Sequence, residues 1–252
     1  NLMALGAARA FTGRDKVMVF DGAYHGGVLY FAHGGSPVNA PFQFVYAPYN
    51  DAPGMIKAIS ENAGDLAAVI IEPMMGAGGC LPADPAFLEA LRSETERHGI
   101  VLIFDEVMTS RSAAGGLQQH LGIAPDITTL GKYVGGGASF GAFGGRADIM
   151  GQFDPTSANS IGHAGTFNNN VMSMAGGYTG LSEVFTPQAA DDLFRRGEDF
   201  RARLNALIRE RNLAMQYSGV GSIMGLHTVG HPIRTPADTT GEVPEKATLL
   251  HL

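Results

Sequence analysis

Lys132 and Asp105 are the residues whose type and setting most clearly indicate chemistry. Lys132 is the only charged residue in TTLGKYVGGG, between an apolar run and three glycines. A lysine desolvated among apolar groups has its ammonium form disfavoured, which leaves a neutral amine that can attack a carbonyl and form an imine. Asp105 ends the apolar run IVLIFD, where a carboxylate needs a cationic or hydrogen-bonding partner such as a protonated ring nitrogen. Together they meet two demands of a pyridine-ring aldehyde, the chemistry of pyridoxal phosphate.

Each of these two residues also has a less specific interpretation. Many parallel-sheet proteins end a strand in Asp for metal binding, phosphate chemistry or a helix cap. The glycines after Lys132 could form a phosphate-binding loop, but GxxxxGK[ST] is absent because Tyr133 follows the lysine, and GxGxxG does not occur. The occurrence of Lys132 and Asp105 in one chain favours the cofactor interpretation.

Two further motifs contain side chains that could contact such a cofactor. FDGAYHGG places Tyr24 and His25 in a glycine-flanked loop after a short strand. An aromatic ring there could stack on a planar ligand, with ordinary packing as the alternative. HAGTFNNN contains Thr166, whose hydroxyl and neighbouring amide suit a phosphate oxygen. Because a helix is expected to begin close by, Thr166 could instead be a helix cap.

The elements that must position these residues alternate between strands and helices. The clearest helix is predicted over 84–99, with Asp84 as its N-cap, Pro85 in its first turn and Gly99 at its end. Runs rich in branched residues predict strands at 17–20, 66–73, 100–107 and 126–132.

This alternation predicts an α/β fold with a mostly parallel sheet flanked by helices. Such sheets place their sites at the carboxyl ends of the strands. Glu72, Asp105, Glu106 and Lys132 each come directly after an apolar run. We therefore expect these four side chains to converge on one crevice.

The pattern downstream is helical from about 169 to 212, with a loop at FTPQ. Apolar Leu193, Phe200, Leu204 and Leu207 fall on one stripe of the later helix. We expect a cofactor-binding large domain over 1–185, and a linker helix with an incomplete C-terminal small domain over 186–252.

The composition indicates a globular protein without a nucleic-acid partner. Its 252 residues are 45% hydrophobic, and its formal charge of -7 argues against binding a polyanion through Lys and Arg. No run of about 18 apolar residues predicts a membrane span. The single cysteine, Cys80, excludes an intrachain disulfide and a cysteine-based zinc cluster, and it fits a reducing compartment. We expect a cytoplasmic protein without a metal site.

The motifs AYHG, VIIEPMMGAGG, LIFDEVMTSR, TTLGKYVGGG, FGAFGGRADIM and HAGTFNNN resemble, in that order, those of the class III aminotransferases of fold type I. The sequences of these motifs most resemble those of the branch that contains glutamate-1-semialdehyde aminomutase and the aromatic β-amino acid aminotransferases. The run HAGTFNNNVMSMAGG leans toward the latter. The resemblance implies the large domain of a fold type I enzyme and pyridoxal 5'-phosphate as its cofactor.

The resemblance also implies a role for each candidate residue. Lys132 would hold the cofactor as a Schiff base and shuttle the proton, and Asp105 would pair with the pyridine nitrogen. Tyr24 would stack on one face of the ring and Val107 would pack on the other. Glu72 would lie close to the cofactor and organise the site.

Three further assignments concern the surroundings of the cofactor. Thr166 would reach the phosphate of the neighbouring subunit's cofactor, which implies an obligate homodimer. His25 also matches the motif as a cofactor-site residue, with a supporting role. Arg111 receives no catalytic role. Asn1 resembles the last residue of a Ser/Gly-Thr-Glu-Ala-Asn phosphate loop, so the chain looks truncated at both ends.

The implied reaction moves an amino group from an amino acid donor, with an aromatic β-amino acid as a candidate, to a keto-acid acceptor. Two alternatives stay open. One is a glutamate-1-semialdehyde 2,1-aminomutase type of transfer within a single substrate. The other is an inactive cofactor-binding fragment, because segments that hold the phosphate and read the substrate would be missing.

Overall fold

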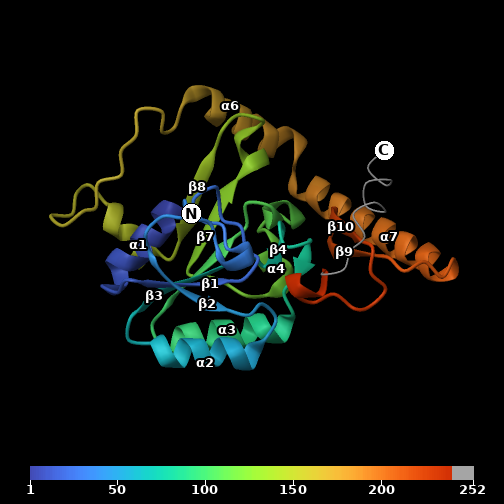
Figure 1. The fold of residues 1–252 in the computed structure, drawn as a ribbon. Coiled ribbons are helices and arrows are strands. Elements are labelled where there is room, and N and C mark those ends of the chain that lie inside the picture. The colour runs from blue at the N-terminus through green and yellow to red at the C-terminus, as the bar shows by residue number, and fades with distance from the viewer. Residues whose placement is uncertain (240–252) are drawn as a thin grey trace.

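The computed structural model describes residues 1–239 as a six-stranded sheet with helices on both faces (Figure 1). The strand order is β2-β1-β3-β6-β7-β8, all pairs being parallel except β7 with β8. The expected α/β fold with a mostly parallel sheet is confirmed. The strands of this sheet are β1 (Lys16–Phe20), β2 (Gln43–Ala47), β3 (Leu66–Ile71), β6 (Val101–Asp105), β7 (Ile127–Gly131) and β8 (Gly141–Gly145).

Helices cover the sheet and connect several of its strands. α2 and α3 lie side by side on one face, and α1 contacts β3 and β6 from the other side (Figure 1). Within the described residues, no helix is long and apolar enough to cross a membrane. The α-helices are α1 (Leu2–Thr12), α2 (Ala52–Asn62), α3 (Pro85–Arg97), α4 (Leu117–Leu121), α5 (Ala147–Met150), α6 (Val171–Thr179) and α7 (Pro187–Glu210).

Shorter elements complete the chain. Two small antiparallel pairs are β4 (Met74–Met75) with β5 (Leu81–Pro82), and β9 (Gln216–Val220) with β10 (Ile223–His227). A π-helical turn over Gly180–Val184 follows α6 directly. Turns of 3₁₀ helix occupy Ala32–Gly34, Thr109–Ser112, Lys132–Gly135, Gly151–Phe153 and Pro236–Thr239.

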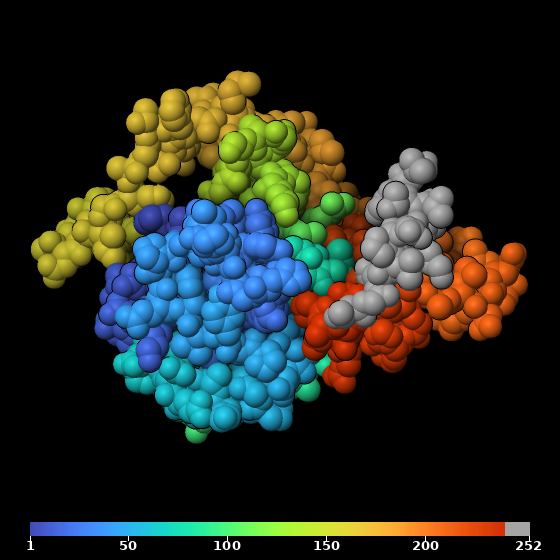
Figure 2. Space-filling view, viewed as in Figure 1, coloured from blue at the N-terminus to red at the C-terminus, as the bar shows by residue number. Residues whose placement is uncertain are grey.

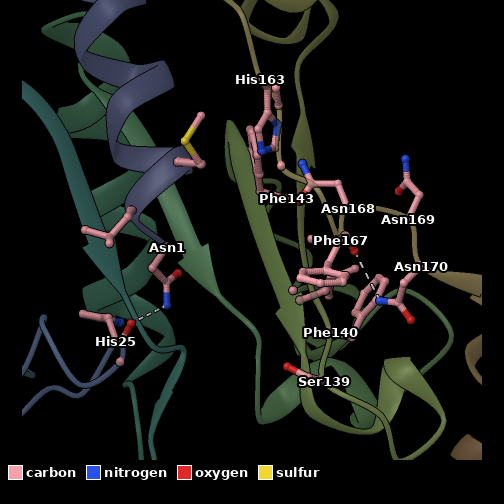
Figure 3. Close-up of a pocket in the computed structure, with 18 of the residues that line it drawn as sticks. Asn1, His25, Ser139, Phe140, Phe143, His163, Phe167, Asn168, Asn169 and Asn170 are labelled. Carbon is pink, nitrogen blue, oxygen red and sulfur yellow. Dashed lines mark hydrogen bonds between the residues drawn. The ribbon is translucent and has the colours of Figure 1, made fainter. Parts of the chain in front are cut away.

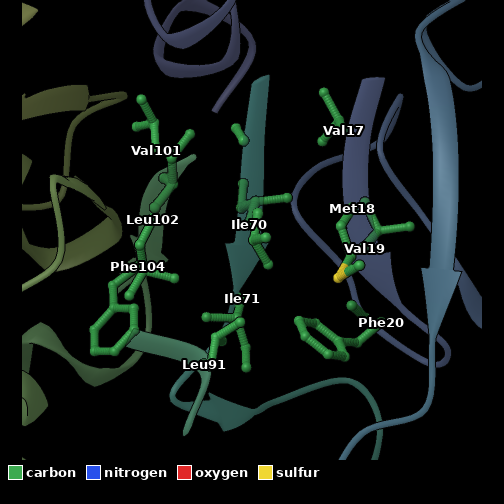
Figure 4. Packing of buried hydrophobic residues seen from close by; sticks show 14 of the residues in the cluster. Val17, Met18, Val19, Phe20, Ile70, Ile71, Leu91, Val101, Leu102 and Phe104 are labelled. Atoms are coloured by element: carbon green, nitrogen blue, oxygen red, sulfur yellow. The ribbon is translucent and has the colours of Figure 1, made fainter. Parts of the chain in front are cut away.

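The core lies around the three central strands β1, β3 and β6. Every residue of β3 is fully buried, because helices cover the sheet on both faces and leave no polar side to the strand. Leu91 of α3 packs onto this layer (Figure 4). The strands contribute Val17, Met18, Val19, Phe20, Ile70, Ile71, Val101, Leu102 and Phe104 (Figure 4).

The predicted strands all occur, with ends that differ by at most two residues. The helix predicted over 84–99 spans Pro85–Arg97, and Gly99 follows it with φ of 61°. Asp84 occupies the N-cap position but makes no capping hydrogen bond, since its carboxylate pairs with Arg234 instead.

The helical region downstream is confirmed with its break at the predicted FTPQ loop, where α7 begins at Pro187. The residues of the predicted apolar stripe lie on the continuous helix α7, and part of the stripe is exposed, since Phe200 is 54% exposed and Leu207 is 46% exposed. Gly197 lies on the face of α7 that packs against the turn between β9 and β10, since a Cβ there would lie 2.4 Å from the backbone of Gly221. The domain boundary at 185 stays a prediction, and residues 240–252 of the second domain lie outside the described residues.

Candidate active site

Asp105 ends β6, and both of its carboxylate oxygens are hydrogen-bonded. Oδ2 accepts a hydrogen bond from Nδ2 of Asn1 at 2.8 Å and lies 2.8 Å from Nδ1 of His25. Oδ1 accepts from the amide of Val107 at 3.0 Å and from the hydroxyl of Thr129, the paired residue on β7, at 3.4 Å. The residue is only 5% exposed. The carboxylate is therefore fixed in place by the protein alone.

These contacts also fix the charge of Asp105. Burial by itself would raise the pKa of this carboxyl group, because desolvation disfavours the anion. The hydrogen bond and charge of His25, with the hydrogen bonds from Val107 and Asn1, outweigh burial and lower the pKa of Asp105 below its ordinary value of 3.8. The site thus holds a desolvated anion at neutral pH, which suits a cationic partner.

His25 lies behind this carboxylate, with its ring completely buried. Its carbonyl oxygen accepts a second hydrogen bond from Nδ2 of Asn1 at 2.8 Å. Its Nε2 atom is buried and has no hydrogen-bond partner among the described residues. Of the two ring nitrogens of His25, Nδ1 therefore contacts Asp105 and Nε2 makes no hydrogen bond among the described residues.

Glu72 follows β3 and is bound by backbone amides. Its Oε1 accepts a hydrogen bond from the amide of Tyr24 at 3.1 Å, and its Oε2 accepts from the amide of Gly76 at 2.9 Å. Burial raises the pKa of Glu72, and the charge of His25 and the two amides reduce this rise without cancelling it. Tyr24 is 46% exposed, and its ring contacts the ring of Tyr30 edge-on, with 5.7 Å between the ring centroids.

Lys132 follows β7 and opens the 3₁₀ turn Lys132–Gly135 with a left-handed φ of 54°. Its side chain is exposed, so the expectation of a lysine buried among apolar groups is wrong for this structure. The reason is local, since the neighbouring glycines offer no side chains to cover the lysine stem. The space beside the preceding residue is tight, because a Cβ on Gly131 would lie 3.3 Å from the backbone oxygen of Phe140 and 3.4 Å from a methyl group of Val107.

Lys132 and Val107 line one cavity of about 280 Å³. Val107 follows Asp105 by two residues. The end of β6 therefore contributes both the buried carboxylate and one side chain that lines the cavity of Lys132. The remaining lining residues are Met108, Arg111, Tyr133, Ser222, Ile223 and Met224.

A larger cavity of about 910 Å³ lies between Asn1 and His25 on one side and Phe143 with the segment 163–170 on the other (Figure 3). Thr166 lies in this segment but is exposed and lines neither cavity. The chain just before it projects from the body of the molecule (Figure 2). The cap of α6 is Asn170, whose Oδ1 accepts from the amide of Ser173 at 2.9 Å, so the helix-cap alternative for Thr166 is wrong.

Glu106 does not join the predicted crevice. Its carboxylate is fully buried and accepts hydrogen bonds from the hydroxyl of Thr109 at 3.0 Å and from the amides of Leu117 and Gln118 at 2.6 and 2.9 Å. Successive side chains at a strand end point to opposite sides, so Glu106 points away from the side occupied by Asp105. Burial raises the pKa of Glu106, and the donors around it limit the rise.

Asn1 and Thr129 are two contributors that sequence reasoning missed. Asn1 contacts Asp105 across 104 positions, and its Oδ1 accepts from the hydroxyl of Thr129 at 2.7 Å. The position of Thr129 beside Asp105 follows from the register of the parallel strands β6 and β7. The usable signal was a polar residue three positions before Lys132 within an apolar strand.

The sequence of the chain is similar to those of known proteins. The family model described as aminotransferase class III matches residues 2–246. The beta-phenylalanine transaminase of Variovorax paradoxus is 55% identical over 238 residues, which are 94% of this chain and 55% of that protein. The glutamate-1-semialdehyde 2,1-aminomutase 2 of Brevibacillus brevis is 39% identical over 247 residues, which are 92% of this chain and 57% of that protein. The chain spans little more than half the length of these relatives.

Solved structures agree with the sequence matches. The beta-phenylalanine aminotransferase from Variovorax paradoxus has a TM-score of 0.96 at 53% identity, over 99% of this chain and 58% of that one. A transaminase with PLP bound has a TM-score of 0.80 at 33% identity, over 94% of this chain and 59% of that one. With a family model that covers almost its whole length, the chain belongs to the class III aminotransferases.

Proposed function

We propose that this chain is the cofactor-binding part of a pyridoxal-phosphate-dependent aminotransferase that moves the amino group of an aromatic β-amino acid to a keto acid. The observation that carries the proposal is the buried anion of Asp105 beside the strand that presents Lys132. The donor class is taken from the Variovorax relative, which is named for beta-phenylalanine. The single cysteine fits our further proposal of a cytoplasmic location.

The residues present fit pyridoxal phosphate. Asp105 is anionic and desolvated, so it favours a protonated ring nitrogen as its partner. Val107 places apolar methyl groups in the cavity of Lys132, where they can pack against a flat ring. The exposed ring of Tyr24 is free to stack on a ligand, and Glu72 holds the backbone of Tyr24 in place. These residues, with Lys132, are the ones that would hold the cofactor.

Bound pyridoxal phosphate supplies an electron sink for the carbanion that forms next to the substrate amine. Asp105 maintains the proton on its cationic partner because its own lowered pKa keeps it anionic. His25 and Asn1 hold the carboxylate in one orientation. The Nζ amine of Lys132 serves as the base that takes the proton from the substrate carbon and later returns it. Its exposure leaves the side chain room to move between these positions.

We also propose that two copies of the chain associate through the segment 166–184. This segment exposes large apolar side chains, with Phe167 82%, Val171 79% and Tyr178 74% exposed, which is unusual for a surface without a partner. Thr166 would then reach the cofactor of the second copy. Light scattering should give a dimer for the wild-type chain and a monomer for V171D/Y178D. A monomeric wild-type chain would refute this pairing.

The experiment that tests the function combines cofactor absorbance with turnover. The chain mixed with pyridoxal phosphate should develop a band at roughly 410–430 nm, the range of a protonated imine with a lysine. It should then consume β-phenylalanine together with an equal amount of pyruvate or 2-oxoglutarate. Absence of the band would refute cofactor binding. A band without turnover would instead support the inactive cofactor-binding fragment.

An aminomutase is the second candidate, favoured by 39% identity to a glutamate-1-semialdehyde 2,1-aminomutase. The same residues would serve it, because the amine would leave and return to a single substrate. The keto-acid requirement separates the two. Turnover of an amino substrate without any keto acid would favour the aminomutase and overturn the aminotransferase proposal.

A further inference from the structure

The backbone of Lys132 lies in an unusual conformation. Its φ of 54° falls in the left-handed region, which residues with a Cβ adopt rarely. Such a conformation costs energy and persists only where the surrounding structure imposes it. The side chain of Lys132 is exposed, so its own contacts do not impose the conformation. The residues that follow Lys132 supply the constraint.

The segment after Lys132 packs against helix α6 and the residues that follow it. The hydroxyl of Ser173, a buried residue of α6, donates a hydrogen bond to the carbonyl oxygen of Ser139 at 2.8 Å. The ring of Tyr133 lies edge-on against that of Phe185, with 5.2 Å between the ring centroids. These two contacts hold the segment 133–139 at both of its ends.

Between these two contacts the backbones of the turn and of α6 approach each other closely. A Cβ added to Gly177 would lie 2.4 Å from the carbonyl oxygen of Val134. This distance is far below an ordinary non-bonded separation of about 3.5 Å. The obstructing atom belongs to the backbone, so a side chain at Gly177 would push the turn away from the helix. Val134 follows Lys132 by two residues, so this displacement would reach the lysine.

α6 contains a second glycine that is not needed for this contact. Gly176 and Gly177 are adjacent in α6, although glycine is less favourable than alanine within a helix. A Cβ on Gly176 would lie 3.4 Å from its nearest neighbour, the carbonyl oxygen of Gly135, which is an ordinary contact. Of the two glycines, Gly177 is therefore the one that the packing of the turn requires.

We infer that Gly177 is a positioning residue for Lys132, because its lack of a side chain lets α6 hold the turn that presents the lysine amine to its cavity. This inference rests on the proposed function and deepens it, since it assigns the residue that sets where the imine-forming lysine is attached. The side chain of Lys132 stays free to move while its backbone is fixed. A displacement of about 1 Å at a reacting group can cost about 100-fold in rate.

The test compares the same substitution at adjacent positions, Gly177→Ala and Gly176→Ala. Gly177→Ala should weaken imine formation with pyridoxal phosphate, followed by the absorbance band, by about 10- to 100-fold. Gly176→Ala should change it by less than about twofold. Pyridoxine phosphate has an alcohol in place of the aldehyde and binds without an imine. Its dissociation constant, measured by calorimetry, should change by less than about twofold in both variants.

Two results of this comparison would overturn the inference. One is equal imine formation in Gly177→Ala and wild type. The other is an equal loss of imine formation and of pyridoxine phosphate binding, because Gly177 would then support the whole site and not the lysine. If Gly177→Ala does not fold, Ser173→Ala decides, since it loosens the same contact without adding an atom. It should weaken imine formation alone, by about 2- to 10-fold, and unchanged imine formation would overturn the inference.

A measurement on the chain without cofactor separates this inference from the proposed function. A wild-type chain without an absorbance band would refute the proposed function. Amide NMR spectra would still test the position of the turn, because Gly177→Ala should shift the signals of residues 132–137 more than Gly176→Ala does. Equal shifts in the two variants would overturn the inference.

Discussion

The two strand ends that carry the proposed site are built in opposite ways. Asp105, at the end of β6, is buried and held by four hydrogen-bonding groups before any ligand is present. Lys132, at the end of β7, is exposed and lies in a left-handed turn next to glycines. A group that only maintains a charge gains from being fixed, since it needs no reorganisation during the reaction. A group that must bind, release and carry a proton needs room. We call Asp105 with its hydrogen-bonding partners the fixed side of the site, and Lys132 with its turn the mobile side.

Substitution of Lys132 should have the largest effect, because it tests the mobile side. Lys132→Arg retains the positive charge but not the nucleophilic primary amine, so we expect turnover to fall at least about 1000-fold and the absorbance band to vanish. Lys57→Arg is the matched control, at an exposed lysine that pairs with Glu61 on α2. A band that persists in Lys132→Arg would show that another amine holds the cofactor.

Substitution of Asp105 should come second, because it tests the fixed side. Asp105→Asn retains the shape but removes the anion, so kcat should fall by about 100-fold or more while the dissociation constant for pyridoxal phosphate changes much less. Steady-state kinetics and a cofactor titration measure the two effects. Asp191→Asn, at an exposed residue of α7, is the control. Equal kcat in Asp105→Asn and wild type would contradict the role of the charge.

His25→Phe should release the fixed side without touching the reacting atoms. Asp105 has a lowered folded pKa, so its contribution to stability is complete above its unfolded value of 3.8 and is lost as the pH falls through the folded value. Without His25, desolvation dominates and the pKa rises. We expect acid unfolding at a higher pH and a loss of about 1–3 kcal/mol at neutral pH. An unchanged acid midpoint, followed by circular dichroism, would contradict this coupling.

Glu72→Gln should give the smallest effect. The folded pKa of Glu72 is raised, so its contribution to stability is greatest below the ordinary value of 4.5 and falls as the pH rises through the folded value. The variant cannot ionise, so the free energy of unfolding of wild type should fall relative to it by roughly 1 kcal/mol between pH 4 and 7. Denaturant titrations measure this, with exposed Glu61→Gln as control. Parallel curves would show that burial does not raise this pKa.

The fixed side was largely predictable from sequence because local patterns determine it. Apolar runs end in Glu72 and Asp105, and parallel strands bring their carboxyl ends to one edge. The hydrogen bonds that complete the site were not predictable, since Asn1 reaches Asp105 over 104 positions and only the folded chain brings them together. The position of Thr129 beside Asp105 does follow from strand pairing, and this residue is buried.

The mobile side was less predictable. The apolar neighbours of Lys132 in the sequence predicted a buried lysine. The glycines among these neighbours have no side chains that could cover it, and the lysine is exposed in the structure. Glu106 was expected beside Asp105, but strand alternation turns it away toward the start of α4. The proposed role of Thr166 requires a second copy of the chain, which no pattern within one sequence can position.

The buried carboxylate of Glu106 has a consequence for how the proposed active site could adapt to different substrates. It ties the loop behind Val107 and Arg111 at Thr109 and again at Leu117, so one wall of the cavity behaves as a rigid template. The opposite wall consists of Ser222, Ile223 and Met224 from the β9–β10 hairpin. We therefore expect new donor preferences to evolve on the hairpin, while changes in the loop cost folding stability before they alter selectivity.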